Sequence, residues 1–255
     1  MTKHRFFIPP ENFIEGQVNF PAALQAQISR VLRLKAGEEV EVLDNLGSSF
    51  RVALAKHPDG SWLGKIIAFG KIDSEPNIRL TLFFGLTQRE KVEWILQKGT
   101  EVGVSAFQPF NSRRTLAQQP DSALKHRARW EAILREAAEQ SGRGCIPLLN
   151  QPLKLNDAVN LAADSHQQVI AAWEDETFQG LKAALGEKQL SAIALFCGPE
   201  GGFDPAEIEL MRSAGVHFFS LGRRILRMET AAILAPALVL YELGEMAVDR
   251  PAGRL

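Results

Sequence analysis

Two segments near the C-terminus combine residue types that suit close backbone recognition of a ligand with types that suit anion binding. The first is Gly198–Phe203, which reads Gly-Pro-Glu-Gly-Gly-Phe. A glycine pair lets the main chain approach a ligand because no Cβ stands in the way, and Pro199 stiffens the entry to the loop. The alternative is a tight turn that only connects a strand to a helix.

The second segment, Leu221–Ala231, carries Arg223, Arg224 and Arg227 within five residues. Guanidinium groups are planar forks that match phosphates and base edges, and three such charges repel one another unless they share an anion. The alternative is a cluster of solvated loop charges. Glu229 stands where a helix opens, and an acidic residue there is favoured by the helix dipole alone.

Both segments follow short apolar runs, Ala192–Cys197 and Val216–Ser220, and both precede a helical pattern. After the first, Asp204, Pro205 and Glu207 read as an N-cap, a proline at the first helical position and a capping-box glutamate. The two segments are therefore predicted to be loops at the carboxyl ends of strands. In an open α/β sheet, ligands bind at that edge.

From residue 78 onward, apolar runs typical of strands alternate with helical patterns, which predicts a mostly parallel α/β sheet. The expected strands are Ile78–Phe84, Ala106–Phe110, Val169–Ala172, Ala192–Cys197 and Val216–Leu221. The expected helices are Gln88–Val102, Asp121–Gln140, Gln179–Leu185, Asp204–Ser213 and Glu229–Leu243.

The first seventy residues differ, with short strand patterns separated by turn signals, as in a small β-rich, barrel-like unit. One helix is expected there, Pro21–Leu34, with Leu24, Ile28, Val31 and Leu32 on its apolar face. The polar, helix-breaking segment Lys71–Asn77 marks a domain boundary. We therefore expect domains at 1–72 and 73–255.

The composition fits an ordinary globular protein, with 255 residues, 45% of them apolar, and a formal charge of −1. Two distant cysteines, Cys145 and Cys197, favour buried thiols and a reducing, cytoplasmic location over a disulfide. The N-terminus lacks the apolar core of a signal peptide. The longest apolar run, Ala231–Tyr241, contains Pro236 and is about half the length of a membrane span. The five histidines are scattered, so no metal site is expected.

Two common nucleotide sites are disfavoured. The glycines do not follow the G-x-G-x-x-G spacing of a dinucleotide fold, and their loop follows a late strand rather than the first. The sequence also lacks the G-x-x-x-x-G-K-[ST] pattern of a phosphate-binding loop. A nucleotide-binding oxidoreductase is therefore a distant alternative.

The pair of loops resembles the signature of the SPOUT class of methyltransferases and, more narrowly, the RsmE family, which methylates N3 of a uridine in 16S ribosomal RNA. The resemblance extends along the chain in the family's order. Its further segments are Arg30–Leu34 with Gly37, Glu90–Lys98, Glu101–Val104, Arg113, and Glu139–Arg143 with Pro147. The sequence departs from the family pattern at Arg223, where proline is common, and at Met228, where threonine is common.

The resemblance implies a C-terminal α/β domain threaded into a trefoil knot, preceded by a small PUA-like β-barrel domain that binds RNA. It also implies S-adenosyl-L-methionine as cofactor, with a further pocket wall around Trp173 and Glu174. A homodimer through the apolar helix Thr230–Leu243 is expected as well. The implied cofactor-binding residues are Gly198, Pro199, Glu200, Gly201, Gly202, Leu221, Gly222, Ile225, Leu226, Arg227, Thr230 and Ala231.

Methylation of N3 requires an enzyme that favours the uracil anion, through a base or through nearby cations. We expect Arg227 and Arg113 to supply the electrostatic part. Glu101 completes the expected catalytic set as the proton acceptor, but spacing does not distinguish it from Glu139 or Glu200. Glu139 has a second interpretation, as an ion-pair partner of Arg143.

The expected substrate is 16S ribosomal RNA or the small ribosomal subunit. Candidate RNA-binding residues are Arg30, Arg33, Lys91, Lys98, Arg113 and Arg143. Read singly, each of these cations is more often part of a solvated surface. Two alternatives stay open: methylation of a ribose 2′-hydroxyl by the same fold, and a non-catalytic, RNA-binding assembly factor.

Overall fold

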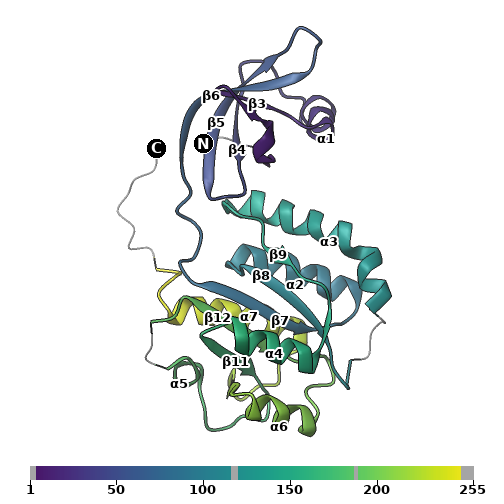
Figure 1. Cartoon of the computed structure of the whole chain (residues 1–255), viewed down its shortest axis with the longest axis vertical. Helices are drawn as coiled ribbons and strands as arrows, with labels where there is room; N and C mark the ends of the chain where they lie inside the picture. The colour runs from purple at the N-terminus through teal and green to yellow at the C-terminus, as the bar shows by residue number, and fades with distance from the viewer. Residues whose placement is uncertain (1–3, 116–119, 187–188, 248–255) are drawn as a thin grey trace. The chain divides into compact units, whose positions relative to one another are not determined.

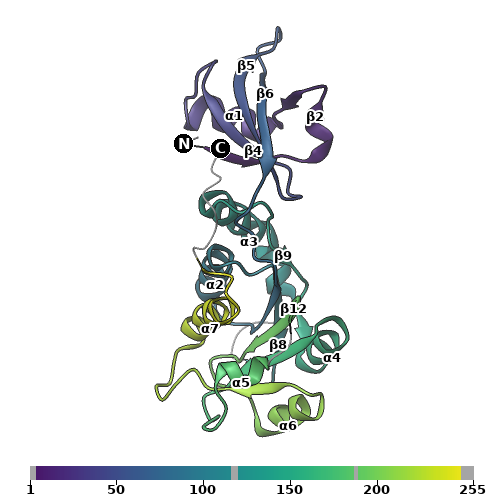
Figure 2. The same cartoon turned by 90° about the vertical axis from the view of Figure 1, so that its left-hand side faces the viewer.

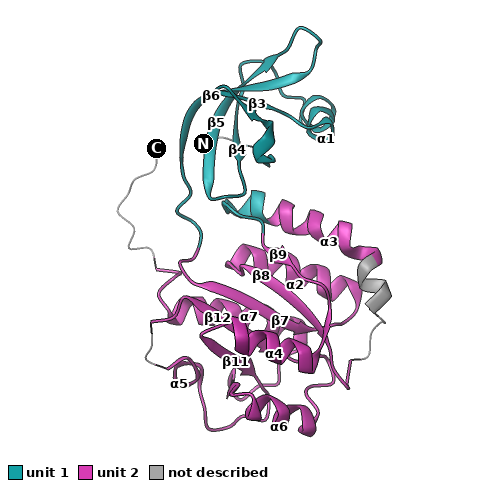
Figure 3. Ribbon diagram, in the orientation of Figure 1, with its two compact units in different colours: residues 1–75, 138–146 teal, residues 76–137, 147–255 magenta. Residues whose placement is uncertain are grey.

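The computed structural model of the chain describes residues 4–115, 120–186 and 189–247 (Figure 1). The chain forms two compact units, shown in different colours in Figure 3. The first unit comprises residues 1–75 and 138–146, and the second comprises residues 76–137 and 147–255. The division falls inside the segment Lys71–Asn77. The return of residues 138–146 to the first unit was not anticipated from the sequence.

The first unit contains a six-stranded sheet in the order β1-β4-β5-β6-β3-β2 within the described residues. Its strands are β1 (Arg5–Phe7), β2 (Phe13–Ile14), β3 (Gln17–Asn19), β4 (Glu39–Leu43), β5 (Ser48–Lys56) and β6 (Trp62–Lys71). β1 pairs with β4 in parallel, and the other pairs are antiparallel. Side chains that include Phe6, Val18, Val40, Val52 and Trp62 form the core of this unit.

The helical segment of the first unit departs from the expected regular helix. It consists of a short α1 (Ala22–Ala26) and a π-helix, η2 (Gln27–Val31). The amide of Leu32 donates to the carbonyl of Gln27, five residues back, at 2.9 Å. The π-turn shifts the helical phase, so that Ile28 is buried but Val31, expected on the apolar face, is 72% exposed. A 3₁₀ turn, η1 (Pro10–Asn12), precedes β2.

The second unit is built on a parallel sheet in the order β10-β8-β7-β12-β11-β13, with β9 beside β8. This confirms the α/β class and the mostly parallel sheet expected from the sequence. The strands are β7 (Arg79–Gly85), β8 (Ala106–Asn111), β9 (Leu148–Leu149), β10 (Leu153–Lys154), β11 (Gln168–Ala172), β12 (Ala192–Cys197) and β13 (His217–Phe219).

Helices cover both faces of this sheet, with α2 and α7 on one side and α4 on the other (Figure 2). The helices are α2 (Arg89–Val102), α3 (Pro120–Ser141), α4 (Leu155–Ser165), α5 (Leu181–Leu185), α6 (Pro205–Ser213) and α7 (Met228–Glu242). The last turn of α3 belongs to the first unit. Within the described ranges, the structure contains no helix long and apolar enough to span a bilayer.

Strand β12 lies at the centre of the second unit, and each of its six residues is buried. Phe196 on this strand stacks against Phe83 of β7, with ring centroids 4.4 Å apart. On the same face Phe110, Phe203 and Phe218 join them in one apolar cluster. Burying a phenylalanine side chain stabilises a fold by about 1.5–3 kcal/mol, so this cluster fixes the strands whose carboxyl ends carry the loops.

Candidate functional site

The loop Gly198–Phe203, called the glycine loop below, follows β12 and is seated against the end of β7. A Cβ atom on Gly85, the last residue of β7, would lie 2.7 Å from the backbone nitrogen and Cα of Pro199. Only glycine therefore lets the two segments approach this closely. The loop turns through a hydrogen bond from the amide of Gly202 to the carbonyl of Pro199, at 2.9 Å, with Gly202 at φ +68°.

The helix after the glycine loop begins with the expected capping box, which the structure confirms. The Ala206 amide donates to Asp204 Oδ1 at 3.0 Å, and the Asp204 amide donates to Glu207 Oε2 at 2.9 Å. The other carboxylate oxygen of Glu207 accepts the amide of Arg113, at 2.8 Å. The segment that follows β8 is thereby fixed to the start of α6.

Two arginines from this segment lie beside the glycine loop. The Arg113 guanidinium lies 3.5 Å from Asp204 Oδ1, and 69% of its side chain is exposed. Arg114 Nη1 donates to the carbonyl of Gly201 at 3.3 Å. Arg113, expected in both the catalytic and the RNA-binding sets, is therefore placed next to the glycine loop with its cation open to solvent.

The loop Trp173–Gly180, called the β11 loop, follows β11 and contacts both the glycine loop and the residue before Leu221. The Glu174 carboxylate lies against Gly202, so that a side chain on that glycine would displace it. At its other end, the carbonyl of Gln179 accepts the amide of Ser220 at 2.9 Å, immediately before Leu221. The wall expected around Trp173 and Glu174 thus contacts the glycine loop through Glu174.

The β11 loop is held in shape by the buried carboxylate of Glu176, which is 9% exposed. It accepts the amides of Phe178 and Gln179 at 2.9 and 3.1 Å, and it lies 3.7 Å from the Arg212 guanidinium. The guanidinium of Arg212 also lies over the ring of Trp173, at 5.6 Å. An arginine over an aromatic face gains a favourable cation–π interaction.

The segment Leu221–Arg227, called the arginine loop, follows β13 and leads into α7. Gly222 has φ +106°, in the left-handed region that favours glycine. Arg223, Arg224 and Arg227 are exposed, and Ile225 is 87% exposed. Beyond this loop, Thr230 is exposed and Ala231 is half-buried. The arginine loop therefore presents apolar, main-chain and cationic groups that a ligand could contact.

A polar cluster joins the glycine loop to the first turn of α7. The Thr87 hydroxyl donates to Glu200, and Lys91 Nζ lies 3.1 Å from Glu200 Oε1 and 3.8 Å from Glu229 Oε2. The pKa of Glu200 is held below its ordinary value, first by the Thr87 hydrogen bond and then by Lys91. Thr87 and Glu229 are buried, at 4% and 8% exposure. Sequence reasoning missed Thr87 and treated Glu229 only as a first-turn charge.

Two of the carboxylates considered as proton acceptors lie apart from this cluster. Glu101 pairs with Lys98 at 2.8 Å in the last turn of α2. At 1.5 Å per residue, it lies about 15 Å along the helix from Lys91. Glu139 belongs to the first unit, where it accepts the amide of Phe7 at 3.0 Å. Within one chain, only Glu200 of the three candidates belongs to the loops at the sheet edge.

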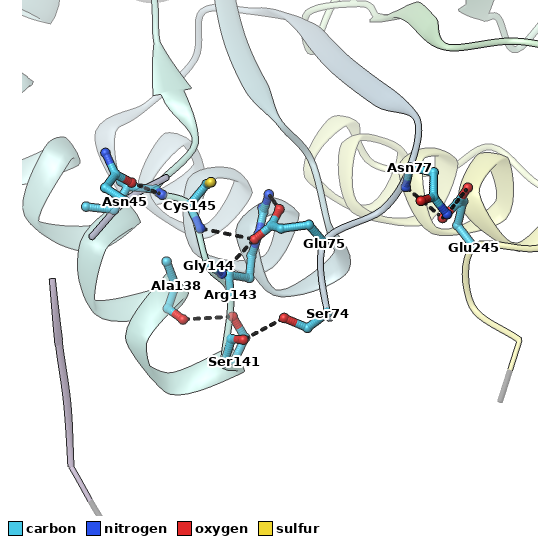
Figure 4. A network of polar contacts seen from close by, with 12 residues as sticks. Asn45, Ser74, Glu75, Asn77, Ala138, Ser141, Arg143, Gly144, Cys145 and Glu245 are labelled. Carbon is cyan, nitrogen blue, oxygen red and sulfur yellow. Dashed lines mark hydrogen bonds and ion pairs between the residues drawn. The ribbon is translucent and has the colours of Figure 1, made fainter. Parts of the chain in front are cut away.

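Arg143, which was expected to bind RNA, has its side chain inside the first unit. Arg143 is 4% exposed, and its guanidinium is paired with Glu75 (Figure 4). A buried, paired guanidinium cannot reach a phosphate without losing that partner. Arg30 and Arg33 of the first unit are exposed, whereas Lys91 and Lys98 are engaged with carboxylates of the second unit.

The three loops lie at one edge of the sheet because they follow β12, β11 and β13, which are neighbouring parallel strands in that order; the β11 loop contacts the glycine loop through Glu174 and the start of the arginine loop through Ser220. The glycines expose main-chain groups, and the arginine loop adds apolar side chains, so the edge fits a small, partly apolar ligand held mainly by backbone. The exposed arginines beside it fit a polyanion. Within the described residues, no group of three or more His, Cys, Asp or Glu side chains is arranged to hold a metal ion.

Comparison with known proteins agrees with this geometry. An RNA methyltransferase domain family matches residues 74–240. The ribosomal RNA small subunit methyltransferase E of Synechocystis is 33% identical over 92% of this chain and 77% of its own length. The protein of the same name from Bacillus subtilis is 31% identical over 84% of this chain and 86% of its own length.

Solved structures resemble most of the chain. The ribosomal RNA small subunit methyltransferase E of Neisseria gonorrhoeae, bound to S-adenosyl methionine, has a TM-score of 0.82 and 27% identity, covering 94% of this chain and 97% of that one. A putative methyltransferase from Legionella pneumophila, in complex with the same cofactor, has a TM-score of 0.79 and 26% identity, covering 95% and 98%. The chain therefore belongs to the RNA methyltransferase domain family and, within it, to the ribosomal RNA small subunit methyltransferase E (RsmE) family.

Proposed function

We propose that this chain binds S-adenosyl-L-methionine between the glycine loop and the arginine loop and methylates N3 of a uridine in 16S ribosomal RNA. The observation that carries the proposal is that three loops follow neighbouring strands at one sheet edge, where glycines at positions 85 and 202 let Pro199 and Glu174 pack closely against the backbone. Family membership and the cofactor-bound relatives support the choice of ligand. Because the proposed substrate is 16S ribosomal RNA or the small ribosomal subunit, the reaction is proposed to take place in the cytoplasm.

When bound, S-adenosyl-L-methionine supplies a methyl group on a sulfonium, which a nucleophile displaces in line. The contribution of the chain is to orient the two reactants, and good orientation lowers a barrier by roughly 7–11 kcal/mol. The proposed contacts are the main-chain groups of Gly198–Gly202 and Leu221–Leu226, with Thr230 and Ala231 at the start of α7. The pair of loops is already fixed by Gly85, Asp204 and Ser220.

Uridine N3 carries a proton at neutral pH, so the site must favour the uracil anion. We assign this electrostatic task to Arg227, which is exposed at the end of the arginine loop, and to Arg113, which is exposed beside the glycine loop. A cation placed near a carbonyl oxygen stabilises the charge that develops there. Glu101 is not carried into this mechanism, because it lies at the opposite end of α2.

The finer fold features belong to the same proposal. The segment that follows β13 is proposed to thread into a trefoil knot before α7 packs against α2 and β12. The sheet of the first unit is proposed to act as a PUA-like RNA module that presents Arg30 and Arg33. Shape-dependent contacts of this kind position structured RNA and help to hold an unstacked base.

A homodimer is proposed through α7. Leu234, Leu238 and Tyr241 are spaced along one side of the helix and are 38%, 36% and 70% exposed. An apolar stripe of this kind gains free energy when a second copy covers it. Light scattering should give twice the chain mass at micromolar concentration, and Leu238→Glu should give the single-chain mass.

The function is tested by incubating the purified protein with methyl-labelled cofactor and small ribosomal subunits that lack the modification. The RNA is then digested to nucleosides, and the labelled nucleoside is identified by mass. The proposal expects label on the uracil base. Label on a ribose would instead indicate 2′-hydroxyl methylation, and absence of label with intact RNA binding would indicate an assembly factor.

A further inference from the structure

One lysine stands between two carboxylates that come from different loops of the proposed cofactor site. Lys91, in the first turn of α2, lies 3.1 Å from Glu200 of the glycine loop and 3.8 Å from Glu229 of α7. About a quarter of the Lys91 and Glu200 side chains is exposed, and a tenth of that of Glu229. These contacts are therefore partly shielded from solvent.

The two carboxylates mark the two walls of the site. Glu200 stands between Pro199 and Gly201, and Glu229 directly precedes Thr230. Thr87, two residues after β7, donates to the same carboxylate oxygen of Glu200 that Lys91 contacts. The ammonium group is consequently a bridge whose removal disconnects the glycine loop from the start of α7.

Removal of Lys91 would also create repulsion. Two carboxylate oxygens lie within 4 Å of one nitrogen, so without it they face each other in a partly desolvated setting. Coulomb energies between charges in such settings exceed those in bulk water several-fold. Glu229 Oε2 has no hydrogen-bond donor within the described part of the chain, which leaves Lys91 to balance its charge.

We propose that Lys91 is a positioning residue that joins the glycine loop to the first turn of α7 and so preforms the cofactor site, and that it is not an RNA contact. The inference rests on the proposed function, because it assumes that these loops hold the cofactor. The expected RNA-binding role of Lys91 is replaced, since its ammonium group is already engaged by two carboxylates.

Calorimetric titration of S-adenosyl-L-methionine tests the proposal directly. Lys91→Met should raise the Kd by about tenfold, as expected when a coupled charge network is broken. Lys98→Met is the matched control, because Lys98 lies on the same helix and, among the residues that the structure describes, pairs with Glu101 one turn away. Its cofactor Kd should stay within about twofold of the wild-type value.

A second substitution that restores cofactor affinity distinguishes repulsion between the two carboxylates from loss of folding. In the Lys91→Met background, Glu229→Gln removes one of the two facing charges, so the cofactor Kd should return to within about threefold of wild type. Lys91→Arg should also retain most of the affinity, because it keeps the positive charge. The apparent Kd for 16S RNA, measured by filter binding, should be the same for wild type and Lys91→Met.

The outcomes are distinguishable. If Lys91→Met bound the cofactor like wild type, or lost only RNA affinity, the proposal would be overturned. If wild type bound no cofactor, the proposed function itself would fail. Hydrogen exchange of the Gly201 and Gly202 amides, measured without cofactor, would still test whether Lys91 joins the two segments. The exchange should be faster in Lys91→Met than in Lys98→Met. Should Lys91→Met not fold, Lys91→Gln carries the same expectations.

Discussion

The guanidinium of Arg143 donates two hydrogen bonds to the carboxylate of Glu75, from Nη2 to Oε2 at 2.7 Å and from Nε to Oε1 at 3.2 Å. Glu75 Oε1 also accepts the amides of Gly144 and Cys145, at 2.8 and 3.2 Å (Figure 4). This carboxylate thus attaches residues 138–146 to the first unit. We therefore expect a structural role for Arg143, which the family resemblance placed among the RNA contacts.

Arg143→Met should therefore destabilise the first unit rather than weaken RNA binding by the folded protein. Breaking a largely buried ion pair costs several kcal/mol, and because Glu75 remains a quarter exposed we expect about 2–3 kcal/mol. Urea unfolding measures this. The control is Arg51→Met, an exposed pair with Glu39 that should cost less than about 1 kcal/mol. Equal unfolding free energies for the two variants would refute the structural role.

Gly85→Ala should disturb the glycine loop through a single methyl group. The added Cβ would lie 2.7 Å from the backbone of Pro199, so the loop must move, at a cost of about 1–3 kcal/mol in stability. We also expect weaker binding of S-adenosyl-L-methionine. Gly180→Ala is the matched control because its Cβ would meet open space. Thermal unfolding and calorimetry should separate the two variants, and similar behaviour would show that the close contact is unimportant.

Cys197 makes the stability of the folded protein depend on pH in the alkaline range. Burial raises the pKa of its thiol to about 12, whereas the unfolded chain releases that proton near its ordinary value of about 8.5. The unfolded state therefore binds fewer protons above pH 8.5, and stability falls by about 1.4 kcal/mol per pH unit until the native pKa is reached. Cys197→Ala removes this component.

The measurement is the unfolding free energy of wild type and Cys197→Ala at pH 8 and pH 10. The advantage of wild type over the variant should shrink by about 1–2 kcal/mol between the two values, because only wild type carries the buried thiol. Thiol-labelling of the native protein should correspondingly modify Cys145 before Cys197. A constant difference between the two proteins would contradict the raised pKa.

The exposed arginines of the first unit should contribute to RNA binding through phosphates. Arg30→Ala and Arg33→Ala should each weaken binding of 16S RNA fragments and reduce the slope of log K against log salt by about 0.7–0.9. Filter binding from 50 to 300 mM salt measures the slope. Arg51→Ala, already paired with Glu39, is the control for general charge loss. Unchanged slopes for Arg30 and Arg33 would remove this face from the RNA interface.

Local signals in the sequence predicted much of the second unit. β12 has the expected bounds, and α6 begins with the expected capping box, because both depend on neighbouring residues. Helix α4 was missed although Leu155, Ala158, Val159 and Ala162 are all buried and spaced as a helical stripe. Its several alanines make a weak apolar pattern, which explains the omission.

The partners of charged side chains were beyond sequence reasoning, because they are distant along the chain. Lys91 meets Glu200 and Glu229, more than a hundred residues away, and Arg143 meets Glu75. A matched motif indicates that a residue matters for the family, but not which group it contacts. The π-helix at Gln27–Val31 was likewise hidden, because its extra residue per turn leaves no pattern that differs from a regular helix.

The central claim is that the three loops at the sheet edge form one S-adenosyl-L-methionine site. Calorimetric titration of the cofactor into wild type and Gly202→Val tests it most directly, because the backbone of Gly202 has φ +68°, which a β-branched residue rarely adopts, and a side chain there would also displace Glu174. The account predicts one equivalent bound per wild-type chain and at least a tenfold weaker Kd for the variant. Equal affinity in folded wild type and variant, or no binding to wild type, would contradict it.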